Sequence, residues 1–153
     1  MEFQIRTYQA SDAGRLAEMV KRCLLQVNSR DYSSQIIDRL CLYYSPERFI
    51  ELSSRRQIYI ARSGSSVLGT VSREDNHVYT MFVDPDWAGH GIGRKLMRHI
   101  EGLAAQEGHD NMETDASITA HNFYQRLGYV DLHEEQTDMG LLYVMRKPLH
   151  QER

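Results

Sequence analysis

The sequence predicts an α/β fold in which one mixed sheet is flanked by helices. Three observations predict this fold class. Short alternating segments separated by turns fill residues 57–83, as in antiparallel strands. After residue 83, helix-like and strand-like segments alternate, which is the order of βα units. A chain of 153 residues can bury one core, so we expect a single domain over residues 1–153.

In the N-terminal half we expect one strand, three helices and then three strands. Residues 3–8 alternate apolar and polar side chains, and the next segment has helical periodicity after a cap at Ser11 or Asp12. A polar loop over 28–34 separates it from the second helix, and Pro46 suits the first position of the third. We expect a strand at 3–8, a first helix that ends near 27, a second helix at 35–42 and a third that begins at 45. Three strands follow at 57–62, 67–73 and 77–83.

The C-terminal half is expected to hold two helices and three strands. The helix over 92–107 would turn four apolar side chains inward, namely Ile92, Leu96, Ile100 and Leu103. A short helix would end at Gly128, a residue that readily terminates helices. The remaining expected elements are strands at 111–114, 129–134 and 141–147 and the short helix at 119–127.

Composition excludes several classes of function. The chain has 18 basic and 21 acidic residues, a net charge of −3, which argues against a nucleic-acid partner. No apolar run approaches the ~20 residues that span a bilayer, and no signal peptide is apparent, so we expect no membrane association. Cys23 and Cys41 show no metal-binding spacing and the histidines do not cluster, which predicts a reduced, cytoplasmic protein without a metal.

The most informative segment has a glycine at every second position, Gly89, Gly91 and Gly93, between an apolar strand and an amphipathic helix. A helix N-terminus presents unpaired amides and a positive dipole end, so this segment can bind phosphate. It is not a P-loop, because Leu96 stands at the position of the metal-binding hydroxyl. It lacks the dinucleotide fingerprint, because Arg94 takes the place of the third glycine. A tight turn without a ligand is the alternative interpretation.

Two motifs resemble those of the GNAT superfamily of N-acetyltransferases. The first is the family's pyrophosphate loop, Val-x-Pro followed by Gln/Arg-x-x-Gly-x-Gly/Ala, and here it comprises Val83, Pro85, Ala88, Gly91 and Gly93. Ala88 departs from the usual Gln or Arg, which removes one side-chain contact. The second is Asn-x-x-Ala-x-x-Phe-Tyr-x-x-x-Gly-Phe, and here it comprises Ser117, Ala120, Phe123, Tyr124, Gly128 and Tyr129, with serine in place of asparagine. The resemblance covers about residues 55–148.

The resemblance implies the GNAT fold, a sheet whose central strand and the next one splay apart and hold coenzyme A in the gap. It implies acetyl-CoA as the cofactor, with its pyrophosphate held by main-chain amides. The residues that it places at the coenzyme are Met81, Phe82, Val83, Ala88, Gly89, His90, Gly91, Ile92, Gly93, Arg94, Lys95, Ser117, Ala120, Phe123 and Tyr124.

The resemblance also implies direct attack of an amine on the thioester, with Tyr124 as general acid near the departing sulfur. A phenol with a pKa of ~10 is a weaker acid than a thiol at ~8.5, so full proton transfer is uphill by about 2 kcal/mol and Tyr124 would act mainly by hydrogen bonding. Simple aromatic packing beside Phe123 is the alternative role.

A base is needed because an amine with a pKa of ~10.4 is only about 0.04% neutral at pH 7. Glu74 and His77 are the main candidates, with Asp75 beside them. Counting back from Val83, strand alternation puts His77, Tyr79 and Met81 on one face and Val78, Thr80 and Phe82 on the other. Tyr32 and Tyr79 are expected to contact the acceptor.

The predicted function is acetyl transfer from acetyl-CoA to a primary amine of a small molecule or an amino-acid-like acceptor. Ten acids against four bases in residues 101–153 would favour a cationic amine, or form a solvated acidic surface. Three alternatives remain open: an acetyltransferase acting on protein N-termini or lysines, a non-catalytic acyl-CoA-binding module, and a nucleotide-binding module. The apolar strand at 141–145 could support a homodimer.

Overall fold

The computed structural model describes residues 2–149, and one seven-stranded sheet forms its centre in the order β1-β2-β3-β4-β5-β7-β6. The strands are β1 (Gln4–Thr7), β2 (Gln57–Ser63), β3 (Ser66–Glu74), β4 (His77–Val83), β5 (Asn111–Ser117), β6 (Val130–Thr137) and β7 (Gly140–Pro148). The helices are α1 (Ala13–Gln26), α2 (Ser34–Tyr43), α3 (Pro46–Leu52), α4 (Ile92–Gln106) and α5 (His121–Arg126). Short 3₁₀ turns are η1 (Ala10–Asp12), η2 (Asn28–Arg30) and η3 (Pro85–Trp87). The single domain expected over 1–153 extends at both ends beyond the described residues.

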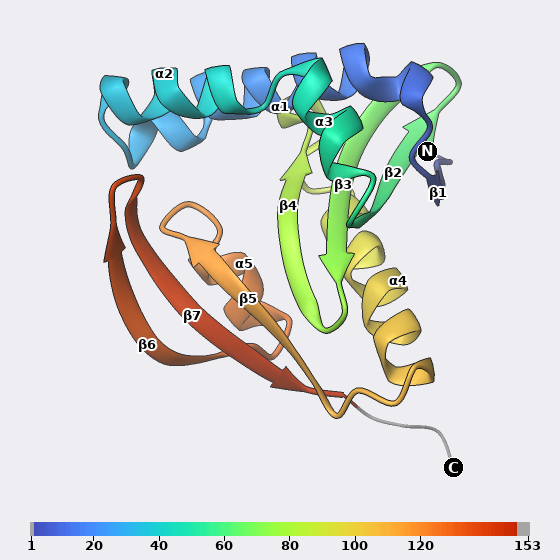
Figure 1. Cartoon of the computed structure of the whole chain (residues 1–153), viewed down its shortest axis with the longest axis vertical. Coiled ribbons are helices and arrows are strands. Elements are labelled where there is room, and N and C mark those ends of the chain that lie inside the picture. The colour runs from blue at the N-terminus through green and yellow to red at the C-terminus, as the bar shows by residue number, and fades with distance from the viewer. Residues whose placement is uncertain (1, 150–153) are drawn as a thin grey trace.

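The sheet is mixed, as predicted, and it divides between β4 and β5. Strands β1–β4 form an antiparallel meander, and β5, β7 and β6 form a second antiparallel group. The two groups meet through parallel pairing of β4 with β5, which joins His77 to Glu113 and Val78 to Thr114 and goes no further. Beyond these pairs the green β4 and the orange β5 diverge in Figure 1. We call this divergence the splay, and it confirms the predicted fold.

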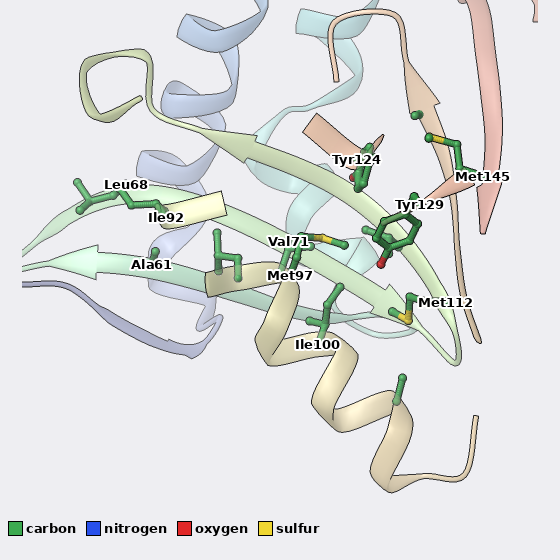
Figure 2. Packing of buried hydrophobic residues seen from close by; sticks show 14 residues of the cluster. Ala61, Leu68, Val71, Ile92, Met97, Ile100, Met112, Tyr124, Tyr129 and Met145 are labelled. Carbon is green, nitrogen blue, oxygen red and sulfur yellow. The ribbon is translucent and has the colours of Figure 1, made fainter. Parts of the chain in front are cut away.

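Two buried clusters hold the helices to the sheet. The larger one packs α4 and α5 against the strands, and Figure 2 shows Met97 and Ile100 of α4 pointing toward the sheet. The smaller one lies under α1, α2 and α3 on the other face. Ile92, Leu96 and Ile100 are buried as predicted, whereas Leu103 is half-buried and Met97 fills the core instead. Among the described residues, no helix is long and apolar enough to cross a membrane.

Several element boundaries differ from the prediction. Strand β5 continues three residues past the predicted end at Thr114, because its pairing with β7 extends to Ser117. The first helix begins as a 3₁₀ turn, and the Asp12 carboxylate accepts from the Gln9 amide and pairs with Arg6 instead of capping α1. Strand β7 lies between β5 and β6, so the segment at 141–145 has no free edge, and the homodimer stays a prediction.

A bulge in β4 overturns the predicted strand alternation. Thr70 pairs with Phe82 and Ser72 with Tyr79, so two residues of β4 face one of β3. Thr80 has a φ of +46°, a left-handed conformation that is unusual for a β-branched residue. Past the bulge, Met81 therefore packs with the α4 cluster, and Phe82 packs with the cluster under α1. The expectation that His77, Tyr79 and Met81 share one face is therefore wrong at Met81, and the expectation that Val78 and Phe82 share the other face is wrong at Phe82.

Candidate active site

The loop between β4 and α4 is held by side chains and backbone from the sheet and α1. Asp84 is buried, and its carboxylate pairs with Arg22 of α1 and accepts from the Asp86 amide at 2.9 Å. The Asp84 amide donates to Leu68 on β3 at 2.8 Å. The hydrogen bond with Asp84 raises the pKa of the Arg22 guanidinium above its usual value. The loop therefore leaves the end of β4 in a fixed direction.

The amides of residues 88–94 converge at the start of α4. Within residues 2–149, none of them donates to a backbone or side-chain acceptor, and no side chain caps α4 at Gly91. Gly89 and Gly91 have φ values of +81° and +76°, which a residue with a Cβ adopts only at a cost. Unpaired amides at the positive end of a 15-residue helix form an anion-binding site. The glycine segment therefore has free main-chain donors at a helix N-terminus, and its role as a phosphate cradle stays a prediction.

Gly93 has a different role from the other two glycines. It is buried in the first turn of α4, and an added Cβ would lie 2.9 Å from Phe123 Cε1 and 3.0 Å from Met81 Cε. Three predicted coenzyme residues, Met81, Gly93 and Phe123, therefore touch across β4, α4 and α5. The absence of a side chain at Gly93 lets α5 approach the loop closely.

The remaining predicted loop residues lie in distinct environments. His90 is exposed, and its Nδ1 lies 3.1 Å and 3.2 Å from the carbonyl oxygens of Trp87 and Ala88, to which an Nδ1–H can donate. Ile92 is buried in the core, and Arg94 is exposed. Lys95 lies over the Phe3 ring, with Nζ 5.0 Å from the ring centroid. Of these side chains, His90 stabilises the loop.

Tyr124 is buried on α5, and its ring packs edge-on against Phe123 and Tyr129. Figure 2 places Tyr124 and Tyr129 in the same core as Met112 and Met145. Burial raises the pKa of Tyr124 to about 12, partly opposed by its hydrogen bond with the Thr114 side chain on β5. The phenol therefore keeps its proton over the whole neutral range and can only donate it to a strongly basic partner.

Ser117 and Ala120 form the turn that starts α5. Ser117 is the last residue of β5, and its Oγ accepts a hydrogen bond from the Ala120 amide at 3.1 Å. The Tyr124 amide in turn donates to the Ala120 carbonyl at 3.1 Å. The serine thus makes the local backbone contact that an asparagine side chain can also make. This contact holds the start of α5, the helix that carries Tyr124.

On the opposite face of the splay, side chains from β4 and β5 come together. His77 Nε2 lies 3.6 Å from Asp115 Oδ2, and the His77 ring lies 4.6 Å from the Tyr79 ring, between centroids. The Arg56 guanidinium lies over Tyr79 at 3.7 Å from its centroid. Glu74 is exposed at the β3–β4 hairpin and is the cross-strand partner of His77, so both lie at the end of β4 away from the glycine loop. The structure therefore brings His77, Tyr79 and Glu74 to one end of this strand.

Tyr32 bridges the open end of the splay. The Ile118 amide, just after β5, donates to the Tyr32 hydroxyl at 2.8 Å, and Thr119 donates to Asp31 at 2.8 Å. An added Cβ on Gly140, at the β6–β7 turn, would lie 2.7 Å from the Tyr32 ring. Burial raises the pKa of Tyr32. Helix α1 contacts the end of β4, and the segment after α1 contacts the end of β5. The chain from α1 to α2 therefore crosses from one splayed strand to the other, as Figure 1 shows.

Sequence reasoning missed two features of this face. Asp115 was not considered because β5 was expected to end at Thr114. The signal that could have found it is the alternation of Met112, Thr114 and Ala116, which are buried, with the residues between them, since this alternation extends the strand past Asp115. The contact of Tyr44 with the bulge was also missed: Tyr44 hydrogen-bonds to the Thr80 side chain and packs edge-on against Phe82. No local pattern in the sequence signals a bulge at Thr80. Among the described residues, no group of three or more His, Cys, Asp or Glu side chains could hold a metal.

Comparison with known proteins identifies the family. Residues 28–149 match the model of the acetyltransferase (GNAT) domain. The Escherichia coli K12 protein YafP, an uncharacterized N-acetyltransferase, is 26% identical over 152 residues, 96% of this chain and 97% of that protein. The crystal structure of a GCN5-related N-acetyltransferase from Rhodopseudomonas palustris superposes with a TM-score of 0.89 at 24% identity, over 97% of each chain. The PaiA N-acetyltransferase of Thermoplasma acidophilum, solved with coenzyme A, has a TM-score of 0.81 at 19% identity over 97% and 99%. The chain therefore belongs to the GNAT superfamily of acetyl-CoA-dependent N-acetyltransferases.

Proposed function

We propose that this protein transfers an acetyl group from acetyl-CoA to the primary amine of a small molecule or an amino-acid-like acceptor. The row of unpartnered amides at residues 88–94, directly after β4, is the observation that supports the coenzyme most strongly. Its donors fit a diphosphate, and the one buried acid of the loop, Asp84, is neutralised by Arg22. The complex of PaiA with coenzyme A supports the same ligand for this chain.

The backbone of β4 would polarise the acetyl carbonyl. Beyond Val78, β4 has no strand partner on the β5 side, so its amides that point into the splay can donate to a ligand. We assign this role to the segment of Met81, Phe82 and Val83, which follows the bulge at Thr80. Donors held in place in this way stabilise the charge that develops on a carbonyl oxygen during acyl transfer.

Tyr124 would hydrogen-bond to the departing sulfur. With a phenol pKa of about 12, full proton transfer to a thiolate of pKa ~8.5 is uphill by about 5 kcal/mol. Tyr124 therefore acts as a hydrogen-bond donor while the carbon–sulfur bond breaks, and the proton moves late. The bond from the amine nitrogen to the acetyl carbon forms as the carbon–sulfur bond breaks, so no covalent intermediate with the protein is needed.

His77 is the proposed base, acting through water, because four residues of β4 at ~3.3 Å each separate it from Met81. It lies at the root of the splay with Asp115 beside it, and Glu74, its exposed cross-strand partner, is the second candidate. The imidazole accepts the proton that the amine loses, and the Asp115 carboxylate stabilises the resulting cation. Tyr79, next to His77, and Tyr32, at the bridge, would contact the acceptor. That bridge across the open end favours a small acceptor over a folded protein surface.

The test is acetyl-CoA turnover with a panel of small amines, amino acids and peptides bearing free N-termini or lysines. We expect turnover with small amines, and a His77→Gln variant that binds coenzyme A normally but has a lower kcat. Turnover with the peptides alone would assign the protein to the N-terminal or lysine acetyltransferases. Coenzyme binding without turnover on any amine would indicate a non-catalytic module, and preference for ATP would indicate a nucleotide-binding module.

A further inference from the structure

A cavity of about 470 Å³ lies at the edge of the sheet, away from the splay. It is formed by β1, the start of α1, the end of β2 and the β2–β3 turn, and none of its lining residues belongs to the glycine loop or to α5. The residues that matter for its chemistry are Arg6, Ser11, Asp12, Arg15, Arg62 and Ser65. Nothing in the proposed acetyl transfer uses this cavity.

The cavity holds a local excess of positive charge on a protein with a net charge of −3. Three guanidinium groups face one carboxylate. Arg6 occupies that carboxylate through two hydrogen bonds of 2.8 Å each to Asp12. Both this pairing and the Gln9 amide hold the pKa of Asp12 below its usual range, so the group is ionised at neutral pH. Two of the three positive charges therefore remain without an acid of their own.

The two remaining arginines have unused donors. Arg15 donates through Nη1 to the Ser65 carbonyl at 2.8 Å and makes no ion pair with residues 2–149. The Arg62 side chain, half-buried at a register shift between β2 and β3, makes no hydrogen bond or ion pair within residues 2–149, and it is attracted to Asp12 only at longer range. Ser11 and Ser65 add hydroxyl groups to the lining. Guanidinium forks and hydroxyls are together a donor set that binds phosphate.

We propose that this cavity binds the phosphate group of a small phosphorylated molecule, at a site separate from the coenzyme. The organic part of the ligand has room beside it, because a second hollow of about 410 Å³ shares Arg62 and Gly64 with the first. Glu2, Phe3 and Lys95 line this second hollow, so Lys95, which the family resemblance assigns to the coenzyme, is shared with it. Arg62 stands between the two, so its guanidinium can bridge the phosphate and the rest of the ligand.

The test is calorimetric titration of the full chain with inorganic phosphate and with glycerol 3-phosphate, at constant ionic strength and in the presence of saturating coenzyme A. We expect saturable binding of both, and at least a tenfold weakening in Arg62→Gln, since a charge-assisted hydrogen bond contributes on this scale. Arg55→Gln removes the same charge from an exposed position outside both hollows and should bind as the wild type.

Three results would overturn the proposal. The first is no saturable heat with either probe. The second is equal weakening in Arg62→Gln and Arg55→Gln, which would indicate only general attraction to charge. The third is binding that appears without coenzyme A and disappears with it, which would assign the phosphate to the glycine loop. A thermal melt of Arg62→Gln that matches the wild type checks that the substitution leaves the fold intact.

Discussion

The two faces of the splay differ in the groups that they offer to a ligand. On the face to which we assign the coenzyme, the free donors are main-chain amides of one continuous segment, residues 88–94, which contains three glycines. On the face to which we assign the acceptor, the groups are side chains from separate elements, such as His77 on β4, Asp115 on β5 and Tyr32 after α1. A backbone site depends on conformation and tolerates many side chains, whereas a side-chain site changes with each substitution. The first face can therefore stay constant while the second varies with the acceptor.

The largest expected effect comes from Tyr124, the one side chain on the coenzyme face to which we assign chemistry. Tyr124→Phe should lower kcat about 100-fold and leave the Kd for coenzyme A within twofold, because it removes a donor used only as the sulfur departs. Steady-state kinetics and calorimetry measure the two quantities. Thr114→Val is the control, since it removes the hydrogen-bond partner of Tyr124 and keeps the phenol. A Tyr124→Phe enzyme with unchanged kcat would reduce Tyr124 to aromatic packing.

Gly91→Ala should weaken coenzyme binding about thirtyfold. The residue has a φ of +76°, and a Cβ would lie in the amide cradle although no protein atom is within 4 Å of it. Gly108→Ala is the matched control, because Gly108 has a φ of +93°, equally open surroundings and a place at the far end of α4. Both variants should lose about 1 kcal/mol of folding free energy. If both bound coenzyme equally well, the glycine loop would not be the cradle.

The buried phenol of Tyr124 predicts a loss of stability at alkaline pH. Its pKa is raised to about 12 in the folded chain and is ~10 in the unfolded chain, so the unfolded state releases its proton first as the pH rises. The free energy of unfolding should be unaffected well below pH 10 and fall by roughly 1 kcal/mol at pH 11 from this group alone. Urea denaturation at pH 8 and pH 11 measures it. The loss should be smaller by that amount in Tyr124→Phe, and an identical loss would show that the phenol is accessible to solvent.

The smallest expected effect is on the acceptor face. Asp115→Asn should raise the KM for a cationic amine about fivefold, as expected for a partly exposed charge pair, and leave the KM for acetyl-CoA unchanged. Asp110→Asn removes one acid from an exposed position outside the splay and serves as the control. Equal effects of the two variants would mean that only the net charge of the protein matters. A change in the KM for acetyl-CoA would contradict the separation of the two faces.

The difference between a site formed by one continuous segment and a site formed by separate elements explains what the sequence could predict. The glycine segment, the strand before it and the helix after it were all found, because their signals are local. Asp115 was missed because the end of β5 is set by pairing with β7, about thirty residues further on. The predicted sharing of one face by His77, Tyr79 and Met81 failed because the bulge at Thr80 adds a residue that no composition or periodicity reveals. Contacts such as Tyr32 with Ile118 join residues too far apart for a sequence pattern.

The left-handed residue in β4 has a consequence for the length of that strand. Thr80 is an inserted position: Tyr79 before it lies beside His77, and Met81 after it packs against Gly93 and Phe123. Phe82 then returns to the cluster under α1. Deleting residue 80 would therefore restore a regular ladder and leave these side chains on the faces that they occupy now. The bulge adds a residue to the chain without exchanging the two faces of the sheet.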